Sequence, residues 1–106
     1  MRFDPAMGAE IKKTRPALIL QNDIGNQVSS VTVVAAITST VPARLFPVQV
    51  LVNPPEGGLH TPSLIQLNQI RSVDKQRLVK RLGLLASETM SQVDHALGVS
   101  LGLTQL

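Results

Sequence analysis

An eight-residue segment in the first half of the chain places the strongest constraint on the fold. It runs from Val31 to Thr38 with the sequence VTVVAAIT, so it is apolar except for two threonines and rich in β-branched residues. β-branched residues favour strands, and a short continuous apolar run is typical of a strand buried on both faces. The segment is far shorter than the ~20 apolar residues of a membrane-spanning helix. We therefore expect a central strand of a packed β-sheet.

Three other segments have the features of strands. Residues 16–22 contain four consecutive apolar residues, and residues 46–52 alternate in part. Residues 64–73 alternate apolar and polar side chains for most of their length, which predicts a strand with one face in water. Residues 1–14 mix proline, glycine and charged residues without a period, so we expect a loop there.

Residues 74–85 are compatible with two structures. Asp74 can cap a helical turn, and residues 79–85 can equally form a short strand. The segment after them has a helical period. Its apolar stripe consists of Met90, Val93, Leu97 and Leu101. Ser87 is the expected N-cap of this helix, and Gly98 and Gly102 are expected to weaken its last turns by ~1 kcal/mol each.

The order of these elements predicts the fold class. Four or five closely spaced strands followed by one helix indicate a mainly β protein, a small barrel or curled sheet with a C-terminal α-helix packed against it. A chain of 106 residues is most simply one domain, residues 1–106.

Composition excludes several classes of function. The chain has no cysteine, so no disulfide framework or thiolate metal site is expected. Its start lacks the apolar run of a signal peptide, and no segment is long enough to span a membrane, so we expect a cytoplasmic protein without membrane contact. The net charge of +3 permits a nucleic-acid partner, although it can also serve solubility alone. The chain contains two phenylalanines, Phe3 and Phe46, and no tyrosine or tryptophan. These are too few for a protein that binds single strands by stacking bases on such rings.

The sequence offers no familiar cofactor motif. Gly57-Gly58 lacks the flanking glycines and the lysine of a phosphate loop, and neither histidine has a spaced second metal ligand. No cofactor and no metal are therefore expected. His95 falls on the polar face of the predicted helix and is interpreted as a surface residue. His60 lies in a loop, where contact with a ligand and simple solvent exposure are both open.

Glu10, Arg15 and Thr38 form the most informative set of polar residues. Pro16 fixes its own φ and favours an extended conformation at Arg15, so a guanidinium stands where a strand begins. If this strand neighbours the one that ends at Thr38, the two side chains converge on one cavity. An arginine fork suits a phosphate, a hydroxyl adds a donor, and a carboxylate can take a proton from a sugar hydroxyl. These groups meet the needs of metal-free RNA cleavage.

An inert interpretation of the same residues remains open. Glu10 and Arg15 can form a surface ion pair worth ~0–1 kcal/mol, with Thr38 serving only as the end of a strand.

The order of several motifs resembles a known family, the MazF/PemK-type toxin endoribonucleases of type II toxin–antitoxin systems. The motifs are, in order, FDP (3–5), GAE (8–10), TRPALILQND (14–23), VAAITS (34–39), LNQIRSVDK (67–75) and the segment from Val93 to Leu103. Each motif is weak alone, but the ordered set covers nearly the whole chain.

The resemblance implies an SH3-like barrel of the CcdB/PemK kind with a C-terminal helix, working as a homodimer. It implies a groove shared by single-stranded RNA and a MazE-like antitoxin, and metal-free cleavage at a short sequence to 2′,3′-cyclic phosphate and 5′-hydroxyl ends. Arg15 matches the catalytic arginine of the family's R-P motif, Thr38 matches the catalytic threonine that ends the buried strand, and Glu10 matches the loop glutamate. We expect Arg15 to clamp the phosphate, Thr38 to donate to a phosphoryl oxygen, and Glu10 to act as the base.

Several residues are candidates for RNA binding. They are Lys12, Lys13, Thr14, Ser39, Gln69 and Arg71. For each of them a solvated polar face is the alternative interpretation.

One departure from the family concerns the strand that usually precedes F-D-P. This chain begins Met1-Arg2-Phe3, so we expect that strand to be largely absent and a barrel edge to be left without its neighbour. Two other functions remain open: a non-catalytic barrel of the same fold that binds a protein, as CcdB-like toxins do, and a small RNA-binding barrel that uses Lys12, Lys13 and Arg71.

Overall fold

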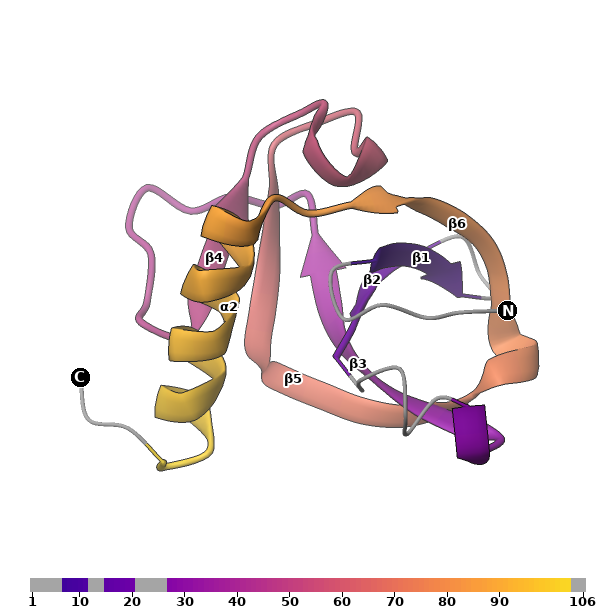
Figure 1. The fold of residues 1–106 in the computed structure, drawn as a ribbon. Coiled ribbons are helices and arrows are strands. Elements are labelled where there is room, and N and C mark those ends of the chain that lie inside the picture. The colour runs from indigo at the N-terminus through magenta and orange to yellow at the C-terminus, as the bar shows by residue number, and fades with distance from the viewer. Residues whose placement is uncertain (1–6, 12–14, 21–26, 104–106) are drawn as a thin grey trace.

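The computed structural model describes residues 7–11, 15–20 and 27–103. Its strands are β1 (Met7–Ile11), β2 (Arg15–Ile19), β3 (Val31–Thr38), β4 (Gln49–Val52), β5 (Ser63–Asp74) and β6 (Leu78–Leu84). They form one antiparallel sheet in the order β4-β5-β3-β2-β1-β6, which curls strongly (Figure 1). Two 3₁₀ turns, η1 (Glu56–Gly58) and η2 (Lys75–Arg77), and the helix α2 (Ser87–Ser100) complete the described elements. A mainly β fold with a C-terminal helix is therefore confirmed.

β3 has the bounds that its sequence predicts, and it lies between β2 and β5. Val34 and Ala35 are consecutive, so their side chains point to opposite faces of the sheet, and both are buried. Ala35 belongs to an apolar cluster that includes Val93 of α2, whereas Val34 belongs to a second cluster on the other face. Burial on both faces is thus confirmed for the middle of β3, while its first residue, Val31, is 41% exposed.

β5 bends sharply at residues 67–69, as Figure 1 shows. Ala35 of β3 pairs with Ile70, but the next residue, Ala36, pairs with Gln66, so the three residues between them leave the ladder. Within the bend the Leu67 N–H donates to the Val48 carbonyl at 2.8 Å. The predicted alternation fails at both ends of the strand and in the bend, because Leu64 and Ile65 are consecutive and both buried, while residues 68 and 69, and again 71 and 72, are both exposed.

Residues 7–11 form β1, so the prediction of a loop is wrong for this segment. β1 pairs with β2 on one side and with β6 on the other. Glu10 therefore lies in a strand. The expected absence of a strand before F-D-P concerns residues that lie outside the described part of the chain. Gly8 and Glu10 give this segment little strand propensity, so pairing with its neighbours decides its conformation.

Other predicted boundaries shift for local reasons. β2 begins one residue earlier than predicted, at Arg15, and residues 21 and 22 lie outside the described part of the chain. β4 begins only at Gln49, because Gln49 N–H donates to the Phe46 carbonyl at 3.0 Å and the Gln49 Oε1 accepts from Phe46 N–H at 3.0 Å, which forms a turn.

Both structures considered for residues 74–85 occur. The Asp74 carboxylate caps η2 by accepting from Gln76 N–H at 2.9 Å, and β6 follows directly.

The helix α2 packs against β4 and β5. Its N-cap is Ala86 and not Ser87, and the Ala86 N–H donates to the Glu56 carboxylate at 2.9 Å. At the other end Gly102 has φ +75° and follows the C-cap Leu101. Its N–H bonds to the Val99 carbonyl at 3.1 Å, and Leu103 N–H bonds to the Gly98 carbonyl at 2.8 Å. This is a Schellman motif, so Gly102 terminates the helix and does not weaken it.

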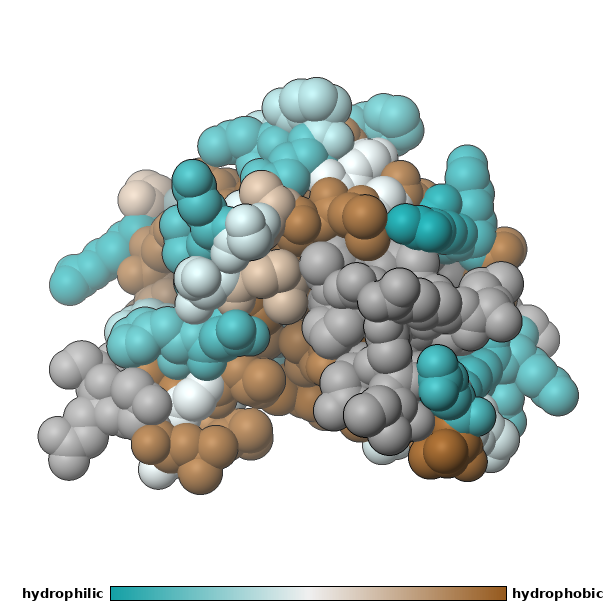
Figure 2. Space-filling model, in the orientation of Figure 1, coloured by the Kyte–Doolittle hydropathy of each residue, from teal (hydrophilic) through white to brown (hydrophobic). Residues whose placement is uncertain are grey.

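The predicted apolar stripe of α2 is correct over its first three positions. Val93 is buried, and Met90 and Leu97 pack against the same cluster. Leu101 is 57% exposed, and Leu103 beyond it is 79% exposed. Figure 2 shows apolar side chains gathered where α2 ends. Among the described residues no helix has the length and apolar character to cross a membrane.

The turn η1 approaches β6 closely, with backbone against backbone. Gly58 has φ +74°, and a Cβ at this position would lie 2.0 Å from the Leu82 carbonyl oxygen. A Cβ at Gly83 would lie 2.8 Å from the Gly57 carbonyl carbon. Only glycine permits this approach, which fixes the loop after η1 against the last strand.

Comparison of two glycines with the same backbone conformation tests this contact. Gly102 has φ +75°, but a Cβ there would meet no atom within 4 Å, so Gly102→Ala should lower the free energy of unfolding by only about 1–2 kcal/mol. Gly58→Ala adds a clash with the backbone of Leu82 to the same strain, so it should lower the free energy of unfolding by at least about 3 kcal/mol. Urea denaturation of both variants measures the difference. Equal losses would mean that the approach of η1 to β6 does not hold the fold.

Candidate functional site

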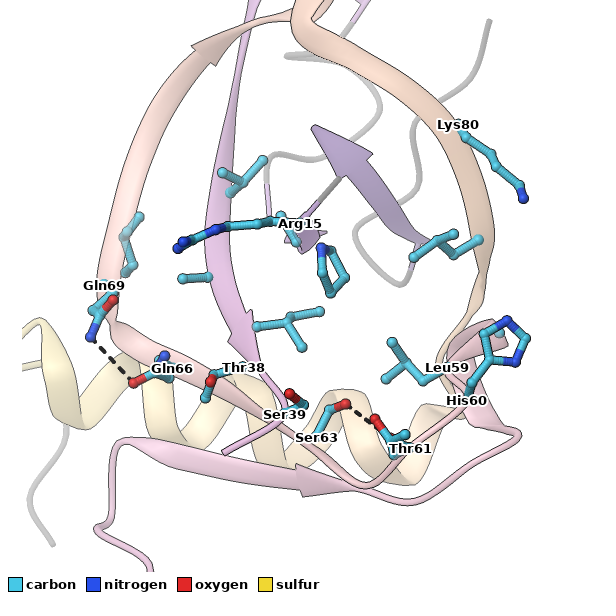
Figure 3. A pocket seen from close by; sticks show the side chains of 18 of the residues that line it. Arg15, Thr38, Ser39, Leu59, His60, Thr61, Ser63, Gln66, Gln69 and Lys80 are labelled. Carbon is cyan, nitrogen blue, oxygen red and sulfur yellow. Dashed lines mark hydrogen bonds between the residues drawn. The ribbon is translucent and has the colours of Figure 1, made fainter. Parts of the chain in front are cut away.

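A cleft of about 910 Å³ opens inside the curl of the sheet (Figure 3). Five residues that the sequence singled out line it together: Arg15, Thr38, Ser39, Gln69 and Arg71. They come from β2, β3 with the residue that follows it, and β5. The cleft is therefore the place where the predicted residues converge.

Arg15 is exposed at the first position of β2, and the strand behind it is anchored. Ala17, Leu18 and Ile19 are buried, and Pro16 is half-buried in the wall of the cleft. In Figure 3 the guanidinium of Arg15 extends across the cleft toward the strand that carries Gln69. The base of this side chain is thus fixed while its charged head stands over the open space.

Thr38 lies on the same side of the sheet as Arg15. Ala17 pairs with Ala36, and Arg15 and Thr38 are each two residues beyond this pair, so the register brings them to one face. The neighbouring strands that the sequence argument required are therefore present. The Thr38 Oγ1 accepts a hydrogen bond from Thr40 N–H at 3.2 Å, which leaves the hydroxyl proton available for donation into the cleft.

Two glutamines stand at the bend of β5. Gln69 Nε2 donates to Gln66 Oε1 at 3.2 Å, and both residues line the cleft. This bond orients both amides and leaves the Gln69 Oε1 as an acceptor and the Gln66 Nε2 as a donor. Gln66 was not among the predicted residues, because the bend that brings it beside Gln69 has no sequence signal.

Glu10 is placed by its strand alone. In the ladder it is the partner of Pro16 on β2 and of Lys80 on β6, and both of these residues line the cleft. Lys12, Lys13 and Thr14 lie outside the described residues.

Two residues on the side of the cleft formed by β6 and the loop after η1, Lys80 and His60, were not assigned to the site from the sequence. Lys80 lies on β6, whose strand character was left open, and assignment of residues 78–84 as a strand would have placed Lys80 and Leu82 on one face. His60 lies in the loop after η1 and was left open between ligand contact and exposure; it lines the cleft and is exposed. His95 is exposed on α2, as predicted.

The described lining of the cleft is positively charged. Arg15, Arg71 and Lys80 contribute to it, and none of its described residues is acidic. A concave surface with one sign of charge concentrates ligands of the other sign, and a polyanion suits three separated cations. In the described ranges no three His, Asp or Glu side chains gather as metal ligands.

Comparison with known proteins gives this geometry a context. A family model described as PemK-like, MazF-like toxin of type II toxin–antitoxin system matches residues 1–101. Endoribonuclease EndoA of Bacillus subtilis is 42% identical over 101 residues, which cover 95% of this chain and 87% of EndoA.

Solved structures agree in fold. An endoribonuclease in complex with its cognate antitoxin from a mycobacterial species has a TM-score of 0.85 at 24% identity, with 97% of this chain and 98% of that chain covered. The Mycobacterium tuberculosis toxin MazF-mt6 has a TM-score of 0.81 at 27% identity, with coverages of 94% and 98%. The chain therefore has the fold of these toxins.

Proposed function

The chain belongs to the PemK-like, MazF-like toxin family of type II toxin–antitoxin systems, and we propose that its cleft cleaves single-stranded RNA with Arg15 and Thr38 as catalytic residues. As a member of this family it is a toxin endoribonuclease, like its relative EndoA. The observation that supports the site is the convergence of Arg15 and Thr38 on one cleft whose described lining holds three cations. Lys12, Lys13, Thr14, Ser39, Gln69 and Arg71 are proposed to contact the rest of the RNA.

The proposed reaction is an internal transfer at phosphorus. The ribose 2′-oxygen attacks the adjacent phosphorus, the bond from phosphorus to the 5′-oxygen breaks, and a 2′,3′-cyclic phosphate and a 5′-hydroxyl result. The Arg15 guanidinium donates two parallel hydrogen bonds to phosphate oxygens. A further N–H of the same group faces the leaving 5′-oxygen, which takes up a proton from water as its bond to phosphorus breaks. As a cation that has donors and no acceptor, Arg15 is not suited to act as the base. Thr38 donates its hydroxyl proton to a phosphoryl oxygen as negative charge develops there.

The proton of the 2′-hydroxyl must be removed as the bond forms. We assign this step to Glu10, because the ladder places it beside Pro16 and Lys80, which both line the cleft. The step needs no metal ion, since cations of the protein carry the charge.

The family and an exposed apolar surface both support the binding partners that we propose for this chain. The mycobacterial endoribonuclease was solved with its cognate antitoxin, and we propose a MazE-like antitoxin and a homodimer for this chain. Phe46 is 64% exposed and the neighbouring Leu45 is exposed as well, which supports burial of this loop in an assembly. Residues 1–106 are proposed to act as one domain in the cytoplasm, without membrane contact.

Digestion of a mixed RNA in EDTA tests the activity and the role of Arg15. The wild-type protein should yield discrete fragments with 2′,3′-cyclic phosphate ends, which mass spectrometry identifies. Arg15→Ala should cleave at least about 10²-fold more slowly, because the charge on the transferring phosphate loses its clamp.

Arg81→Ala is the matched control, since Arg81 is exposed on β6 and does not line the cleft. It should cleave at the wild-type rate, and circular dichroism should show the same fold in all three proteins. Wild-type activity in Arg15→Ala would refute the mechanism. An RNA pool left intact by the wild-type protein would favour a barrel that only binds RNA or protein.

Two substitutions of Thr38 distinguish the role of its hydroxyl group from the role of its side-chain shape. Thr38→Val should lower kcat by about 10²-fold, because a donor to the developing oxyanion is lost. Thr38→Ser keeps that donor and the bond from Thr40 N–H, so most activity should remain. Single-turnover cleavage measures both variants, and equal rates for valine and serine would assign Thr38 to the strand end alone.

The pH dependence of cleavage tests Glu10. A carboxylate base becomes protonated at acidic pH, so the wild-type rate should fall there, and Glu10→Gln should cleave about 10²-fold more slowly at neutral pH without that acidic fall. Glu88→Gln, an exposed substitution in the first turn of α2, serves as the control. An unchanged profile in Glu10→Gln would assign the base to another group.

A further inference from the structure

The cleft extends to a second wall that the proposed reaction does not use. This wall consists of the loop after η1 and of β6, and it carries His60 and Lys80. In Figure 3 both residues lie on the side of the cleft away from Gln66 and Gln69, toward which Arg15 extends. A bound strand of RNA that passes Arg15 and Thr38 can therefore continue onto this wall.

The loop that carries His60 is held on both sides. Before it, Leu59 is only 9% exposed, and Gly58 is locked against the backbone of Leu82. After it, the Ser63 hydroxyl donates to the Thr61 carbonyl at 2.9 Å. The His60 side chain is nevertheless exposed, so a rigid backbone holds an exposed ring at the rim of the cleft (Figure 3). A ligand group that contacts it needs little ordering of the loop.

His60 supplies a type of surface that the rest of the wall lacks. Among the described residues that line the cleft, it is the one side chain with an aromatic ring. Unpaired bases of single-stranded RNA stack on aromatic side chains, histidine included. Lys80 is exposed on the neighbouring strand and offers a cation to a phosphate.

We propose that His60 and Lys80 form a subsite for a nucleotide that flanks the cleaved bond: the His60 ring stacks on its base and Lys80 binds its phosphate. The inference rests on the proposed function, because it needs RNA in the cleft. The subsite contributes affinity that is equal in the ground state and the transition state, so it lowers KM and leaves kcat unchanged.

The test measures binding apart from cleavage. The probe is a fluorescent oligonucleotide with the sequence cut in the digestion, extended on both sides and with a 2′-deoxy residue at the cut, which removes the attacking hydroxyl. His60→Ala should weaken its binding by about fivefold or more, as loss of one stacked base does. His60→Phe keeps a ring and should restore binding. In cleavage assays His60→Ala should raise KM and keep kcat.

Salt dependence tests Lys80. Loss of one phosphate contact to a single strand should make the slope of log K against log salt shallower by about 0.7 in Lys80→Ala. Arg81→Ala, one residue along β6 and outside the cleft, should keep the wild-type slope.

The proposal requires both effects, so unchanged affinity in His60→Ala or an unchanged slope in Lys80→Ala overturns it. It is also overturned if the two substitutions weaken binding of a protein partner and leave RNA binding unchanged. These outcomes are distinct from failure of the proposed function, in which the wild-type protein itself does not cleave RNA.

Discussion

The site depends on the placement of β2 and β3 between two apolar clusters. Successive residues of each strand enter opposite clusters: Leu18 and Ala35 face the helix side, while Ile19 and Val34 face the other. A shift of either strand along its neighbour by two residues would carry a polar end toward the core, and burial of an unpaired charge is strongly unfavourable. The apolar pattern therefore fixes the register, and the register sets Arg15 and Thr38 on one face.

The opposite wall of the cleft is fixed by a different interaction. η1 and β6 meet through Gly57, Gly58 and Gly83, with backbone against backbone. The Glu56 carboxylate also accepts the Ala86 N–H at the start of α2, so the same turn is tied to the helix. One wall of the site is thus positioned by apolar packing and the other by close backbone contact, and both are stiff enough to hold side chains in place for a ligand.

Sequence reasoning succeeded where local pattern and tertiary structure agree. β3 is recognisable from its apolar run, α2 from its period, and the pairing of Arg15 with Thr38 from Pro16 and the end of β3. It failed where distant segments decide the conformation. β1 has weak strand propensity and exists because β2 and β6 pair with it. The bend of β5, which creates the Gln66–Gln69 contact, and the approach of η1 to β6, which sets the wall with His60, involve residues that the sequence does not mark as neighbours.

Not every cation that lines the cleft can contribute to catalysis in the same way. A cation that holds RNA equally before and during the reaction lowers KM without accelerating the chemical step, and only contacts that strengthen as charge develops raise kcat. In the proposed mechanism Arg15 and Thr38 meet that condition, because their donors face one phosphate from two adjacent strands and need no rearrangement as its charge grows. Lys80 and Arg71 stand on other strands, apart from that pair, and suit phosphates that do not react.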